Sequence, residues 1–205
     1  MHLEEKHINA LNKAETLLFP SDFRPYLELK ALLPDSSPPA RNHFRSLFTN
    51  YYGLNTGGLT DEFKNRFFEI LFEGKIMVNG RPDFSPILIE LSEIKRKTGD
   101  CAMPFSFVSK LVGIHLESSP IYDKHVLAFF MKKAPAATVD KSKRIEWYVD
   151  FLNDVSRSYR AWANDSTVKP ILERLKTHDD KLESCHDVRL LDFLVWKVGN
   201  RKLLT

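Results

Sequence analysis

The sequence contains no long hydrophobic run. Apolar stretches such as Val126 to Met131 end in charged residues well short of the ~20 residues that a membrane-spanning helix needs. The first residues include Glu4 and Glu5, where a secretory signal has a basic start and an uninterrupted apolar stretch. We therefore expect a soluble, cytoplasmic protein with no membrane partner.

Common catalytic and metal-binding motifs are missing too. There is no glycine-rich phosphate loop, GxSxG elbow or HExxH pair, which argues against nucleotide hydrolases, α/β-hydrolases and zincins. Cys185 and His186 are adjacent, but no second pair of ligands completes a tetrahedral zinc site. With Cys101 as the other cysteine, at most one disulfide can form, and a chain of 205 residues needs none for stability. The sequence thus predicts no metal and no cofactor.

The composition is that of a globular protein. Apolar residues make up 43% of the chain and charged residues 28%, and there are 15 Phe, 6 Tyr and 3 Trp, whereas disordered chains are poor in aromatic residues. The length lies within the roughly 50 to 250 residues that one hydrophobic core can serve. We therefore expect a single helical domain over residues 1–205.

The spacing of apolar residues indicates helices nearly everywhere, because they recur at intervals of three and four. One helix is expected to start at Ser85 and run through Ile94, and the last to run from about Asp187 to Val198, with Gly199 as a left-handed cap. A long helix after residue 140 has an apolar face made of Ile145, Tyr148, Leu152, Val155, Tyr159 and Trp162. The prediction is an all-α bundle of about nine to eleven helices around one core.

Two short helices carry the candidate catalytic residues. Lys110 lies early in a helix opened by Pro104, and Asp123 lies at the start of the next helix, after a short connection that contains Pro120. Because the connection is short, we expect both side chains to face one cleft. A carboxylate near a helix N-terminus lies in a positive field, and there it can stabilise a developing cation or polarise water.

The same residues form motifs. Asp123-Lys124-His125-Val126 follows Pro120, and Lys110 follows Pro104. This segment resembles the core of the helix-hairpin-helix DNA glycosylase superfamily, in which L-P-G-V-G-x-K-T-A forms the hairpin and P-V-D-T-H-V carries the catalytic aspartate. The resemblance implies that Asp123 is the catalytic carboxylate and that Lys110 stands where the lysine of the lyase members lies.

A looser likeness covers about half of the chain. The segments Ser106–Leu111, Pro120–Val126 and Leu191–Gly199 are similar to "SF-x-SKL…PIYD-x-x-V…LDFL-x-W-x-x-G" in a group of small prokaryotic helical proteins. The hairpin is degenerate, since residues Phe105 to Ser109 replace both hairpin glycines, which let backbone amides approach a DNA phosphate.

The resemblance also implies a reaction. A damaged or modified base, hypermodified phage bases included, would be flipped into a pocket and stacked on aromatic residues. Asp123 would stabilise the cationic sugar as the glycosidic bond breaks, and Lys110 would attack the sugar or hold a phosphate. Excision of the base would follow.

The modest positive charge lies in the C-terminal third. The chain carries a net charge of +3, and residues 132–205 hold 15 Lys and Arg against 11 Asp and Glu. A polyanionic partner such as DNA fits this distribution. The residues expected to contact the DNA backbone are Lys124, Lys132, Lys133, Lys141, Lys143 and Arg144.

Structural explanations exist for the same residues. Asp123 suits a helix cap, Lys110 can extend its apolar stem along a helix, and the basic group can be a solvated loop. Trp196 and Phe193 on the last helix are more typical of a core than of a base-stacking platform. A helical DNA-binding module without chemistry and a protein-interaction domain are therefore the alternatives to a glycosylase.

Overall fold

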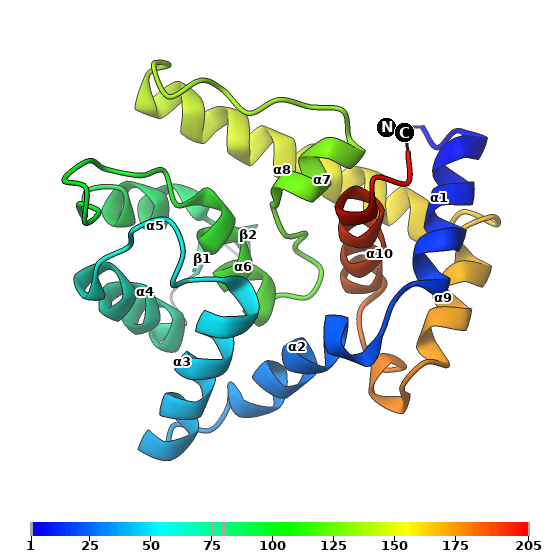
Figure 1. Ribbon diagram of the computed structural model, residues 1–205, viewed down its shortest axis with the longest axis horizontal. Coiled ribbons are helices and arrows are strands. Elements are labelled where there is room, and N and C mark those ends of the chain that lie inside the picture. Colours follow the sequence, from blue (N-terminus) through cyan, green and yellow to red (C-terminus); the bar gives the residue numbers. More distant parts are fainter. Residues whose placement is uncertain (1, 75, 79–80, 205) are drawn as a thin grey trace. The chain divides into compact units, whose positions relative to one another are not determined.

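The structure of the protein, a computed structural model, describes residues 2–74, 76–78 and 81–204. These residues form ten α-helices, one 3-10 helix and one short β hairpin (Figure 1). The all-α prediction is confirmed, and the number of helices lies in the predicted range. Among the helices described, none is long and apolar enough to cross a membrane.

The chain divides into two compact units. The first consists of Met1–Phe23 and Leu116–Thr205, and the second is Arg24–His115. Helix α2 (Pro20–Leu32) begins in the first unit and continues into the second. The prediction of a single domain over 1–205 is not tested by this division and stays a prediction.

The first unit is organised around its last helix. Helix α10 packs against four other helices of the unit, which are α1, α7, α8 and α9 (Figure 1). This is possible because α10 is apolar on most of its circumference, and Leu190, Leu194 and Val195 are fully buried. The elements of the unit are α1 (Glu5–Thr16), α7 (Lys124–Phe129), α8 (Lys141–Ala163), α9 (Lys169–Lys176), η1 (Asp180–Leu182) and α10 (Asp187–Arg201).

The long helix α8 lies as the sequence predicts. Asp140 caps its N-terminus by accepting hydrogen bonds from the backbone amides of Ser142 (2.9 Å) and Lys143 (3.4 Å). The residues of its predicted apolar face are all buried, and they are Ile145, Tyr148, Leu152, Val155, Tyr159 and Trp162.

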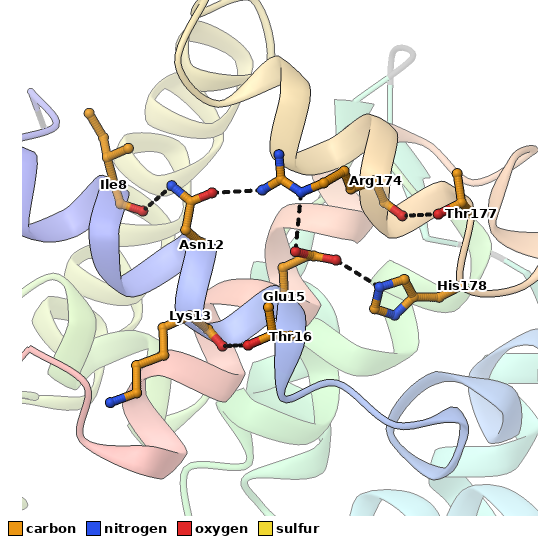
Figure 2. A network of polar contacts seen from close by, with 8 residues as sticks. All are labelled: Ile8, Asn12, Lys13, Glu15, Thr16, Arg174, Thr177 and His178. Carbon is orange, nitrogen blue, oxygen red and sulfur yellow. Dashed lines mark hydrogen bonds and ion pairs between the residues drawn. The ribbon is translucent and has the colours of Figure 1, made fainter.

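A polar network joins α1 to α9 (Figure 2). The buried carboxylate of Glu15 on α1 lies 2.7 Å from Nε2 of His178 and accepts a hydrogen bond from Nε of Arg174 at 3.3 Å. Arg174 also donates to Oδ1 of Asn12 at 2.6 Å. Since a buried carboxylate without partners destabilises a fold, these contacts are what allow Glu15 to lie in the interface between the two helices.

The second unit has an aromatic core. The ring of Phe48 lies 5.8 Å from that of Phe44, 5.4 Å from Phe67 and 5.8 Å from Phe68, between centroids. These stacked, tilted and edge-on pairs add to the stabilisation that burial provides. The other elements of the unit are α3 (Pro38–Tyr52), α4 (Asp61–Glu73), β1 (Met77–Val78), β2 (Arg81–Pro82), α5 (Phe84–Leu91) and α6 (Phe105–His115).

Two details of this unit differ from the sequence prediction. The strands β1 and β2 pair antiparallel in a segment whose glycine and proline predict a loop. Helix α5 ends at Leu91 and does not reach Ile94. The cause is local, because the Ser92 hydroxyl donates to the carbonyl of Ile89 at 2.9 Å and so competes with the helix ladder.

Candidate functional site

Asp123 lies at the N-terminus of α7, in the first unit. It is the N-cap residue, with an extended backbone, and its Oδ1 accepts a hydrogen bond from the backbone amide of His125 at 2.9 Å. The side chain is partly exposed, so it can meet a ligand from solvent as well as cap the helix. The structural role anticipated for this aspartate is therefore present, and the residue is partly exposed.

The segment before Asp123 is held by α10. The guanidinium of Arg189 donates to the carbonyl oxygen of Ser119 at 3.0 Å. The backbone amide of Ile121 donates to both carboxylate oxygens of Asp192, at 3.2 and 3.1 Å. Arg189 and Asp192 also form an ion pair with each other. A segment without regular secondary structure is thus fixed at two backbone atoms by one pair of side chains.

Arg189 and Asp192 are both buried, with 0% and 5% of their surface exposed. Burial raises the pKa of the Asp192 carboxyl to about 7, while Arg189, the Ile121 amide and the neighbouring Tyr159 act in the opposite direction. Burial also raises the pKa of Tyr159. Burying such a pair without hydrogen bonds is costly, so the backbone of the 119–121 segment is a necessary partner of these side chains.

An aromatic pair joins the first turn of α7 to α10, two residues after Asp123. The half-exposed ring of Trp196 on α10 meets the ring of His125 edge-on, with 5.6 Å between centroids. The buried ammonium of Lys197 lies 5.9 Å from the Trp196 ring, 5.7 Å from the Phe19 ring and 2.6 Å from a carboxylate oxygen of Asp22. Phe19 itself is 56% exposed. The expectation of a core residue holds for Phe193, which is buried, and only partly for Trp196, which is half-buried.

Gly199 has a different role from the predicted one. Helix α10 continues through it to Arg201, and Lys202 has the left-handed conformation at the helix end, with φ of 53°. A Cβ atom at Gly199 would lie 2.8 Å from the carbonyl carbon of His125. The glycine is therefore needed for the close approach of α10 to α7, not for a cap.

Lys110 lies in the second unit, on α6. It is 8% exposed, and its Nζ donates to the Ser106 hydroxyl at 3.0 Å. The ammonium also lies 5.4 Å from the centre of the Tyr52 ring and 5.5 Å from that of Phe107. These contacts fix the amine within its unit. Because Lys110 and Asp123 belong to different units, the prediction that they share a cleft stays a prediction.

The segment that was predicted to be a degenerate hairpin is helical from Phe105 onward. Residues Phe105 to Ser109 form the start of α6, and the amides of Phe107 and Val108 donate to the carbonyl of Pro104, each at 3.0 Å. Phe105 is buried against the ring of Phe84, at 6.1 Å between centroids. The bulky side chain thus fills a packing position in this unit.

The six basic candidates all lie in the first unit, with Asp123. Lys124 begins α7, and Arg144, which is half-exposed, lies in the first turns of α8. Between these helices Met131 is 73% exposed and has a left-handed backbone, with φ of 51°. The lysines of the group are all exposed, and they are Lys124, Lys132, Lys133, Lys141 and Lys143.

Arg189 is a residue of this region that was not predicted from the sequence. The available signal was a pair of charges three residues apart, Arg189 and Asp192, inside an otherwise apolar helix, because charges on such a helix are buried only when they are paired. In the described part of the chain, no three His, Cys, Asp or Glu side chains cluster as metal ligands do.

No protein-family model matches the chain, and no match to a curated protein or to a solved structure was found. The resemblance to DNA glycosylases therefore depends on the motif residues alone.

Proposed function

We propose that the protein is a DNA glycosylase-like enzyme that excises a damaged or modified base, with Asp123 as its catalytic carboxylate. The observation that carries the proposal is the arrangement at the start of α7. There the partly exposed Asp123 accepts a hydrogen bond from the backbone amide of His125, whose ring packs against Trp196, on a backbone that α10 holds. A negative charge next to aromatic surface suits a reaction that stacks a base and forms a cation.

The reaction itself is a hydrolysis. The bond between the sugar C1′ and the base nitrogen breaks, its electron pair leaves with the base, and positive charge develops on the sugar. The Asp123 carboxylate stabilises this charge, as carboxylates do in glycoside hydrolysis. Water then adds its hydroxyl to C1′, its remaining proton balances the leaving base, and an abasic site remains.

The surroundings of Asp123 supply binding. A base that leaves the duplex loses its stacking, and the half-exposed Trp196 ring offers a replacement. The exposed lysines from Lys124 to Lys143 lie in the same unit and suit phosphate contacts. The role proposed for Lys110 is either that of an amine that attacks C1′ or that of a phosphate contact.

The direct test is base excision by the purified chain. The substrates are genomic DNA, phage DNA with hypermodified bases and duplexes with single damaged bases, and the readout is strand breakage after alkali. Asp123→Asn keeps the shape of the side chain and withdraws the charge, so we expect excision to fall on the order of 10²- to 10⁴-fold. Asp140→Asn is the matched control, since Asp140 is also an aspartate at a helix N-cap.

The outcomes separate the alternatives. Excision that survives Asp123→Asn, or a parent chain inactive on every substrate, removes the glycosylase proposal. Binding to duplex DNA that weakens steeply with salt, without excision, indicates a DNA-binding module. Absence of both leaves a protein-interaction domain.

A further inference from the structure

Four residues of α10 contact the segment that leads into α7. Arg189 bonds to the carbonyl of Ser119, Asp192 accepts from the amide of Ile121, and both Trp196 and Gly199 lie against His125. The order along α10 is the same as the order along the segment. Successive turns of one helix therefore contact successive residues from 119 to 125.

The spacing explains why one helix can do this. Residues 189, 192, 196 and 199 are separated by three, four and three positions, so they lie on one face of an α-helix. We call this the template face, made of Arg189, Asp192, Trp196 and Gly199. Three of these four, Asp192, Trp196 and Gly199, fall within the LDFLVWKVG stretch, and the catalytic proposal uses only Trp196 of them.

The hydrogen bonds of the template face, which Arg189 and Asp192 make, go to backbone atoms in a segment without helix. Ser119 and Ile121 precede α7, so no helical ladder fixes their amide and carbonyl groups. Only one residue, Tyr122, lies between Ile121 and Asp123, and the Asp123 side chain in turn bonds to the amide of His125. The position of the carboxylate thus depends on where the chain is held at 119 and 121.

We propose that the template face of α10 is the device that positions the Asp123 carboxylate, with Arg189 and Asp192 as positioning residues. Its catalytic consequence rests on the proposed glycosylase function, but the positioning itself does not. Side chains that only filled the core would need no hydrogen bonds to this segment, and an apolar pair of similar volume can replace a buried ion pair at little cost to the fold.

That replacement is the experiment. The double variant Arg189→Met/Asp192→Leu removes both contacts to the segment and leaves no buried charge without its partner. Exchange of the backbone amides is followed by NMR. We expect exchange at the His125 amide, which bonds to Asp123 and not to the replaced residues, to rise at least ten-fold. The amides of α9, which belong to the same unit, should keep their protection.

A stability control accompanies it. Leu175→Ala truncates a fully buried residue of α9 and weakens the same unit without touching the template face. At matched global stability it should leave the His125 amide unchanged. If exchange at His125 is equal in the double variant and in Leu175→Ala, the pair has only a packing role and the proposal is overturned. Should the double variant not fold, Asp192→Asn takes its place. Because this variant keeps an oxygen for the Ile121 amide, we expect exchange at the His125 amide to rise by less than ten-fold, and no rise at all would overturn the proposal.

Measurements of kcat and of the Kd for DNA test the positioning role independently. With an active parent chain, the double variant should lower kcat at least ten-fold and change the Kd for DNA less than two-fold, because the carboxylate is displaced while the basic surface is intact. A change in Kd alone would contradict the positioning role. With an inactive parent chain the glycosylase proposal fails, and the exchange at His125 still decides whether the template face positions the segment.

Discussion

Gly199 of α10 and the backbone carbonyl of His125 in α7 are so close that a Cβ atom at position 199 would lie 2.8 Å from the carbonyl carbon. Glycine inside a helix is ordinarily unfavourable by roughly 1 kcal/mol relative to alanine. Gly199→Ala should nevertheless destabilise the protein, by about 1 to 3 kcal/mol, because the extra atom meets backbone that cannot rotate away. The test is whether Gly199→Ala lowers or raises the free energy of unfolding.

Chemical denaturation of the two forms measures this difference. Asn200→Ala, at the exposed neighbouring position, is the control and should change the free energy of unfolding by less than about 0.5 kcal/mol. A Gly199→Ala form more stable than the parent would mean that α7 and α10 are not in close contact at this point.

Asp192 predicts a specific dependence of stability on pH. Its pKa is raised from 3.8 to about 7 in the folded protein, chiefly by burial. Between these values the folded state holds a proton that the unfolded state releases, so stability falls as pH rises. The slope from this single group is at most about 1.4 kcal/mol per pH unit. The charged and titratable groups around it are Arg189 and Tyr159, and Tyr159 does not titrate in this range because its own pKa is raised.

The measurement is the free energy of unfolding from pH 4 to pH 8 for the parent and for Asp192→Asn. Other carboxylates and histidines titrate in both proteins, so the difference between the two curves isolates Asp192. The parent should lose stability relative to the variant as pH rises towards 7. A constant difference over the whole range would show that Arg189 keeps the carboxylate charged throughout.

A substitution of Lys110 distinguishes a glycosylase whose amine attacks the sugar from one that only hydrolyses the bond to the base. Lys110→Met replaces the amine by an apolar side chain of similar length, which suits its position between the rings of Tyr52 and Phe107. If Lys110 attacks the sugar, a covalent adduct with DNA trapped by borohydride disappears in this variant, while base excision by Asp123 persists. Ser106→Ala removes the hydrogen bond to Nζ and keeps the amine, so the adduct should remain. An adduct that survives Lys110→Met would assign the nucleophile to another residue.

Much of the fold can be predicted from local patterns in the sequence. The six residues of the α8 face are buried as their spacing predicts, and Ser37 and Thr60 cap α3 and α4 through their side chains. These features depend on residues close in sequence. The end of α5 was predicted too late because a hydroxyl, that of Ser92, competes with the helix ladder, and apolar spacing does not report such bonds.

The candidate site was harder to predict because its contacts join residues far apart in the chain. Asp123 could be found from its motif, but the bond from Ile121 to Asp192 spans 71 positions. Gly199 was predicted as a helix cap, since a glycine near the end of an apolar pattern is most often a cap. A contact with the backbone of another helix does not change the local spacing of apolar residues in the sequence. The reason for that glycine could only be seen in three dimensions.

The exposed pair Lys132 and Lys133 gives the sharpest test of a DNA surface. Each phosphate contact that a protein makes to duplex DNA adds about 0.9 to the slope of log K against log salt concentration. If both lysines contact phosphates, Lys132→Gln/Lys133→Gln should weaken binding and reduce that slope by about 2. The double variant Lys95→Gln/Lys97→Gln removes the same charge from exposed positions of the second unit, so it corrects for the change in net charge.

Fluorescence anisotropy with one duplex at several salt concentrations measures both slopes. Because the comparison uses affinity alone, it also decides between DNA contact and a solvated loop when no base is excised. Equal slopes in the two variants would mean that the segment between α7 and α8 does not contact the phosphate backbone.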